Sequence, residues 1–177
     1  MTIIPVYGQG FFHISYNTIY YTIVFDYYDK DGDYAQILMD PRSRREEEKE
    51  IKKNMQRLMD EERIVINGRD VRAVVDSALL EPRGHRRLHS VVFHVRMDYA
   101  PIEGVNVYEN FYEPDTAEYN YTVYWIAPPG GEILTIESEG RVYYQANKRI
   151  AVIRVSKGTR LSGYEAVSFR LGSLSYH

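Results

Sequence analysis

Glutamate and tyrosine side chains are the residues of this chain whose types and spacing are best suited to chemistry. The stretch from residue 98 to 140 contains no Lys or Arg, and its carboxylates alternate with aromatic rings. The charged residues within 141–170 are almost all basic. One interpretation is structural: opposite charges on neighbouring strands help to set the register of a sheet. The alternative is an exposed acidic and aromatic face that binds a sugar, a cation or a basic protein. The residues that we expect in such a partner-binding face are Tyr108, Glu109, Tyr112, Glu118, Tyr124 and Trp125.

A pair of carboxylates is also what a glycoside hydrolase needs. Such enzymes place two carboxyl groups roughly 5–10 Å apart around the scissile bond, one as the acid and the other as the base or nucleophile. Glu109, Glu113, Glu118 and Glu165 are the candidates, and their positions in the sequence do not determine which of them face each other. Whether the chain is an enzyme therefore stays open at this level.

Three arginines, Arg83, Arg86 and Arg87, cluster at the predicted tip of a hairpin formed by residues 70–81 and 89–99. Guanidinium groups can hold phosphate or carboxylate by two-point contacts, so these three residues are candidate anion ligands. No aromatic residue lies among them and the formal net charge is −3, so nucleic acid is not the expected partner. A solvated tip, or one that docks on the acidic face of another subunit, fits this loop better.

The sequence offers little support for a metal or a cofactor. There is no Cys to supply thiolate ligands. His89 and His94 are an odd number of residues apart on one predicted strand and so point to opposite faces, while His85 lies in the loop. The Asp-rich segment 29–33 lacks the ligand spacing of an EF-hand loop. We therefore expect no metal and no cofactor.

Alternation of apolar and polar residues predicts strands within 11–28, 89–99 and 117–127, each with one buried face, and places Ser90 on the outer face of the second. In the last of these, the residues expected inside are Tyr119, Tyr121, Val123 and Trp125, and those expected outside are Glu118, Asn120, Thr122 and Tyr124. Shorter strands are expected at 133–137, 141–146, 149–156 and 164–171. Asn67-Gly68 predicts a tight hairpin, because a type I′ turn needs positive φ at both central residues. Residues 34–39 are expected to be the returning strand of an earlier hairpin.

One amphipathic helix is expected at about 41–61. Asp40 is suited to cap its free amides, and Pro41 is tolerated at the first helical position. The apolar stripe of this helix consists of Ile51, Met55, Leu58 and Met59. Residues 42–50 are almost all charged, so we expect that half to lie in solvent.

These elements predict a mainly β fold, an antiparallel β-sandwich or flattened barrel with the helix across one face or end. No second helical pattern is available to cross between parallel strands, so the sheet is expected to be antiparallel. The 177 residues fit a single domain, 1–177. The chain shows no signal peptide and no apolar run long enough for a membrane span, which favours a cytoplasmic protein. The lack of Cys and the many charged residues resemble hot-adapted proteins.

Two functions follow as expectations. The first is a non-catalytic binding or assembly module whose tyrosine-rich, acidic β face meets a protein, a carbohydrate or a second copy of the chain. The second is a small carbohydrate-active hydrolase that uses two Glu carboxylates.

Overall fold

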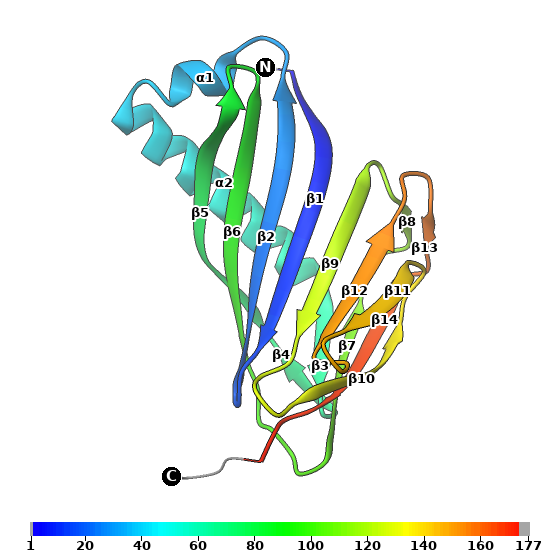
Figure 1. Cartoon of the computed structure of the whole chain (residues 1–177). Helices are drawn as coiled ribbons and strands as arrows, with labels where there is room; N and C mark the ends of the chain where they lie inside the picture. The colour runs from blue at the N-terminus through cyan, green and yellow to red at the C-terminus, as the bar shows by residue number, and fades with distance from the viewer. Residues whose placement is uncertain (1, 174–177) are drawn as a thin grey trace.

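The computed structural model describes residues 2–173, in which fourteen strands form three sheets (Figure 1). The seven-stranded sheet has the order β11 (Arg141–Gln145), β12 (Ile150–Val155), β9 (Asn120–Ile126), β1 (Ile3–Ile14), β2 (Thr18–Asp29), β6 (Leu88–Asp98) and β5 (Ala73–His85). The five-stranded sheet has the order β10 (Glu132–Glu137), β14 (Tyr164–Arg170), β7 (Val105–Phe111), β3 (Arg63–Ile66) and β4 (Arg69–Val71). A small third sheet pairs β13 (Arg160–Leu161) with β8 (Asp115–Thr116).

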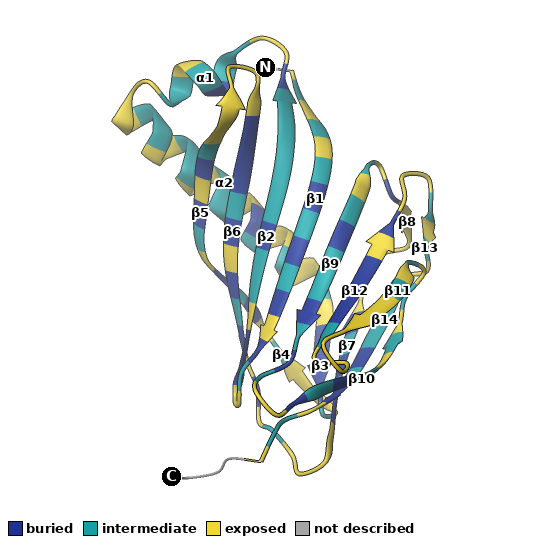
Figure 2. Cartoon of the chain, in the orientation of Figure 1, coloured by how far each residue is buried: buried dark blue, intermediate teal, exposed yellow. Residues whose placement is uncertain are grey.

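The expected mainly β fold with a helix is confirmed. Helix α2 (Pro41–Glu61) passes behind one half of the seven-stranded sheet, and the five-stranded sheet lies behind the other half (Figure 1). Side chains from both sheets and from α2 form one hydrophobic core. Buried positions occur along β6, β9 and β12 (Figure 2), and those of β12 include the consecutive residues 151–153, so this strand is covered on both faces. No helix among residues 2–173 is long and apolar enough to span a membrane.

The period-two pattern of β6 predicts its faces well. Val91, Phe93, Val95 and Met97 are each at most 3% exposed, as the alternation requires. Ser90 was expected to face solvent, but it is only 1% exposed. Its short side chain sits on an interior strand between β2 and β5, where a small residue on the outer face is easily covered.

Strand β1 pairs with β9 in parallel, from Tyr7 opposite Asn120 to His13 opposite Ile126. The other strand pairs among the described residues are antiparallel. The prediction of a wholly antiparallel sheet is therefore wrong at this one junction. The chain between β1 and β9 includes α2, strands β2–β8 and their loops. No single crossover helix connects the two strands, so no helical pattern in the sequence predicts their parallel pairing.

Helix α2 begins and ends where the sequence predicts. The carboxylate of Asp40 accepts hydrogen bonds from the backbone amides of Arg42 and Ser43, and Pro41 occupies the first turn. The expectation that residues 42–50 lie wholly in solvent is wrong, because Arg44 bonds Glu48 and Glu81. These contacts bring the charged half of α2 against β5.

Side chains of α2 also satisfy the free backbone groups of the edge strand β5. Glu48 accepts from the amide of Leu80, and Lys52 donates to the carbonyl of Asp76. Gln56 accepts from the amide of Val75 and donates to the carbonyl of Ala73. Residues 48, 52 and 56 recur every four positions and so form one stripe of the helix. The helix thereby covers an edge that would otherwise be open to pairing with another chain.

Residues 34–39 do not form the expected strand; they belong to helix α1 (Asp33–Ile37) and the turn after it. The cause is Asp29, which is fully buried and whose carboxylate accepts from the amides of Gly32, Asp33 and Tyr34 at 2.9–3.0 Å. A carboxylate that satisfies free amides favours the start of a helix. Strand β2 pairs with β1 on one side, and on the other side it pairs with β6, which is distant in the sequence, instead of with residues 34–39.

The hairpin predicted at Asn67-Gly68 is confirmed. Both residues have positive φ, 52° and 74°, and they join β3 to β4. Asn67 also donates from its side chain to Asn106 and accepts from the amide of Val107, which fixes this turn to β7.

Candidate functional site

A cavity of about 540 Å³ lies between the two large sheets beside the second half of α2. This volume is within the range of small-molecule sites. Its lining contains five carboxylates and no Lys, Arg or His. The acidic residues of the lining are Glu61, Glu62, Glu113, Asp115 and Glu165. The remaining wall is mainly aromatic and aliphatic, so the cavity combines negative charge with apolar surface.

Three different elements bring the polar groups of this cavity together. Glu62 follows the last turn of α2, Asn110 lies on β7 and Glu165 lies on β14. Asn110 is directly opposite Glu165 in the β14–β7 pair, and opposite Ile64 in the β3–β7 pair. Residues directly opposite on neighbouring strands share a face of the sheet, so Glu165 and Asn110 both lie on the face that borders the cavity.

Glu165 has an unusual titration for a carboxyl group. Burial, together with the nearby charges of Glu139 and Glu62, raises the pKa of Glu165 to about 7. Burial also raises the pKa of Glu62, while a hydrogen bond from Asn110 acts in the opposite direction. The cavity therefore holds two carboxyl groups with raised pKa values, and perturbed groups in a cavity are typical of functional sites.

Tyrosine side chains form much of the remaining wall. Burial is the main cause that raises the pKa of Tyr21 and Tyr112 well above the usual value, and the carboxylates of Glu62 and Glu165 add to it. Their hydroxyls are therefore neutral across the physiological range. Two buried polar atoms here, the hydroxyl oxygen of Tyr112 and Oδ1 of Asn110, have no hydrogen-bond partner within residues 2–173. Unpaired buried polar atoms are costly, so each of them is a ready contact for a ligand.

A stack of aromatic rings forms part of this wall, and one of its members, Trp125, lies outside the cavity lining. The ring of Phe12 lies between those of Tyr21 and Trp125, with centroid distances of 3.7 Å and 4.0 Å. Tyr108 contacts the same stack, at 4.9 Å from Trp125. Because Trp125 is the single tryptophan of the chain, its fluorescence can report on events in the cavity.

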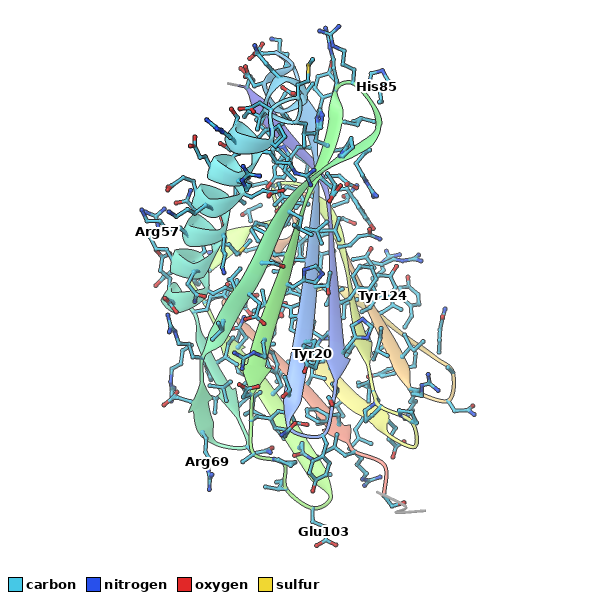
Figure 3. The ribbon with its side chains drawn as sticks, turned by 90° about the vertical axis from the view of Figure 1, so that its left-hand side faces the viewer. Tyr20, Arg57, Arg69, His85, Glu103 and Tyr124 are labelled. Atoms are coloured by element: carbon cyan, nitrogen blue, oxygen red, sulfur yellow. The ribbon has the colours of Figure 1, made fainter. Side chains whose placement is uncertain are left out.

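The structure separates the six residues predicted for a partner-binding face. Tyr108 and Tyr112 line the cavity, and Tyr108 is only 3% exposed, so its prediction as an outer surface contact is wrong. Trp125 is 2% exposed, as its inward place in the alternation requires, and cannot anchor a partner on the surface. Tyr124, which Figure 3 labels, lies on the opposite face of β9 from Trp125. Its ring is stacked on the ring of Phe11, with a centroid distance of 4.9 Å.

The two glutamates of that set do not join the cavity either. Glu109 faces away from it on β7 and accepts a hydrogen bond from the hydroxyl of Tyr164. Glu118 is exposed and is not part of the cavity lining. Of the four glutamates predicted as members of a carboxylate pair, the cavity contains Glu113 and Glu165.

Glu62 and Asn110 are the two most central of the site residues that the sequence analysis missed, which also include Glu61 and Asp115. Met55, Met59 and Glu62 are spaced by four and three residues, so Glu62 continues the apolar stripe of α2 by one step. A carboxylate at that place in a buried stripe is a signal that could have identified Glu62. No comparable signal marks Asn110, whose role depends on which strands flank β7.

The predicted anion-binding arginines are exposed at one end of the molecule. Arg83 bonds Asp26 at 3.1 Å and Arg87 bonds the hydroxyl of Tyr28 at 3.0 Å, so neighbouring side chains of β2 hold two of the three. Arg86 is exposed beside His85, which lies at the hairpin tip in Figure 3. This arrangement does not direct the three guanidinium groups to one point.

Comparisons with known proteins add little to this geometry. No known family model matches the chain, and no curated protein sequence matches it. Among solved structures, native yeast LTA4 hydrolase is similar over 94% of this chain and 29% of its own, with 9% sequence identity and a TM-score of 0.34. Yeast LTA4 hydrolase in complex with bestatin is similar over 96% of this chain and 29% of its own, with 9% identity and a TM-score of 0.33. The chain thus spans less than a third of these structures, and a likeness this weak carries no functional argument.

Proposed function

We propose that this protein is a binding module for a small organic cation, which it holds in the acidic cavity. The observation that supports this most directly is the composition of the lining, which has five carboxylates and several tyrosine rings but no basic side chain. A negatively charged cavity with low-dielectric walls concentrates positive ligands and repels anions. In this proposal, the acidic and tyrosine-rich surface that the sequence predicts for binding lines the cavity and does not lie on the outer face of the sheet.

The contacts around the cavity match the needs of an ammonium group. An ammonium carries only donors, and it needs acceptors or negative charge around it. Glu62, Glu165 and the unpaired Oδ1 of Asn110 supply these acceptors. Tyrosine ring faces add cation–π attraction, which is worth roughly 0.5–2 kcal/mol for each good contact. A cation of this kind also offsets the cost of keeping two carboxylates close together.

A second candidate function is hydrolysis of a glycoside, and one observation favours it. Glu165 titrates near pH 7 beside a second buried carboxyl, Glu62, and a proton-donating carboxyl with a raised pKa is typical of such enzymes. In that case Glu165 would be the general acid and Glu62 its partner. A screen of the wild type and of Glu165→Gln against aryl glycosides tests this candidate. Turnover by the wild type that Glu165→Gln abolishes would support it, and turnover that survives the substitution would remove Glu165 from the mechanism.

Cation binding is tested by titration calorimetry and by the fluorescence of Trp125, with methylammonium and tetramethylammonium at pH 8. We expect saturable binding by the wild type and at least a tenfold loss of affinity in Glu165→Gln. Glu109→Gln is the matched control, because Glu109 is on the same sheet but faces away from the cavity and bonds Tyr164. tert-Butanol, a neutral compound of similar shape to tetramethylammonium, should not bind. Absence of binding of either cation, or equal affinity in Glu165→Gln and wild type, contradicts the proposal.

A further inference from the structure

A second, smaller hollow of about 200 Å³ adjoins the acidic cavity. Six of its nine lining residues also line the larger cavity, so the two spaces share a wall. The shared residues are Tyr21, Ile23, Phe25, Tyr119, Tyr121 and Val123. The other three are Gly8, Gln9 and Gly10 of β1. The hollow lies where β9 begins to pair with β1, since Gly8 is opposite Tyr121 in that pair.

The chemistry of the smaller hollow differs from that of the larger one. Its lining contains no Asp, Glu, Lys, Arg or His, and consists of aliphatic and aromatic side chains, two glycines and one amide. Apolar space of this size can hold an organic group, because in another protein an apolar cavity of about 150 Å³ binds benzene. The hollow is therefore suited to the uncharged part of a ligand.

Two glycines on one face of β1 create the floor of this hollow. A Cβ at Gly10 would lie 2.9 Å from the ring of Tyr21, and a Cβ at Gly8 would lie 3.1 Å from the ring of Tyr119. Glycine weakens the interior of a strand and often marks a place where another group must approach closely. Here the absence of Cβ atoms lets the two tyrosine rings pack directly on the strand, which gives the hollow an aromatic lining at this point.

We infer that the ligand is an amphiphilic cation whose ammonium group lies in the acidic cavity and whose apolar tail lies in the smaller, apolar hollow beside Gly8 and Gly10. This inference rests on the proposed function and specifies its ligand class. Six residues line both spaces, so the two are immediate neighbours, and the inference requires one molecule to reach from one into the other. Burial of the tail adds affinity in proportion to its apolar surface, up to roughly fourfold for each buried methylene.

A series of primary amines tests the inference: methylammonium, n-butylammonium and n-hexylammonium, titrated against the wild type at pH 8. We expect the affinity to rise with chain length, by at least tenfold from methyl to hexyl. Hexanol and hexanoate are the neutral and anionic controls, and both should bind much more weakly than hexylammonium because they cannot satisfy the carboxylates.

Val123→Phe is the diagnostic variant, because Val123 lines both spaces and a larger ring would fill the apolar hollow. Because Val123 also lines the acidic cavity, the readout is the ratio of hexylammonium affinity to methylammonium affinity within the variant, and this ratio should fall below about three. Val24→Phe is the matched control on the opposite face of β2, next to Ile23 in the chain, and should keep the wild-type ratio.

The outcomes separate the inference from the function on which it rests. Binding of all three amines with equal affinity by the wild type overturns the apolar subsite and leaves the cation site intact. Binding of none of them overturns both. If Val123→Phe still binds methylammonium and its affinity still rises with amine chain length as in the wild type, the tail does not lie in this hollow.

Discussion

The side-chain amide of Asn110 donates a hydrogen bond of 2.9 Å to the carboxylate of Glu62, which joins the end of β7 to the residue that follows α2. This contact opposes the effect of burial on the pKa of Glu62 and so favours its charged form. It also orients the amide, whose Oδ1 accepts no hydrogen bond within residues 2–173. The pair thus presents one negative charge and one neutral acceptor to the same cavity.

Asn110→Leu should weaken cation binding in a pH-dependent way. Without the donated hydrogen bond the pKa of Glu62 rises further, which disfavours its charged form most at the lower end of the pH range. We expect a loss of affinity for methylammonium of at least fivefold at pH 7 and a smaller loss at pH 9, measured by calorimetry. An equal loss at both values would show that Asn110 acts only through its own acceptor atom.

Cation binding by the wild type should tighten between pH 6 and pH 8. The pKa of Glu165 is about 7, so its carboxyl changes from mostly neutral to mostly charged over this interval. Titrations at half-unit steps of pH should show a rise in affinity that levels off above pH 8. Glu165→Gln should lack this rise, and a variant that retains it would show that another group controls the titration.

Glu165 should also make folding stability depend on pH. Its pKa in the folded protein, about 7, is above its ordinary value of 4.5, so between these values the folded state keeps a proton that the unfolded state has released. Raising the pH through this window therefore lowers the free energy of unfolding, by up to about 3 kcal/mol.

Thermal unfolding of Glu165→Gln tests this directly. The variant should unfold at a higher temperature than the wild type at pH 8 and at a similar temperature at pH 4. Glu109→Gln, which removes a carboxylate charge outside the cavity but keeps an acceptor for the Tyr164 hydroxyl, should show no such gain at pH 8. A lower melting temperature of Glu165→Gln at pH 8 would contradict the assigned burial of this carboxyl.

Gln56→Leu should destabilise the protein without any effect on the cavity carboxylates. Gln56 bonds the amide of Val75 and the carbonyl of Ala73 on the edge strand β5, and leucine leaves both backbone groups unpaired. We expect a loss of about 1–3 kcal/mol, measured by urea unfolding. Arg57→Ala is the control, since Arg57 is exposed on the outer side of α2 (Figure 3) and its removal should cost less than about 0.5 kcal/mol. Similar losses for the two variants would indicate that the helix does not protect this edge.

Local sequence patterns predicted the parts of the fold that depend on neighbouring residues. The period-two alternation of β6 identified its buried face, and Asp40 with Pro41 identified the start of α2. The same reasoning failed at residues 34–39. There the buried carboxylate of Asp29 stabilises a helix start, and that contact depends on tertiary burial rather than on the pattern of the segment.

Which residues share the cavity could not be predicted in this way. Glu62, Asn110 and Glu165 are far apart in the sequence, and they meet because β3, β7 and β14 are neighbours in the five-stranded sheet. The parallel pairing of β1 with β9 likewise places Gly8 beside Tyr121. The sequence by itself determined which face of each strand is apolar, since side chains alternate at a fixed period. Only the tertiary structure decided which carboxylates are buried together, because strand order is set by long-range packing that no local period encodes.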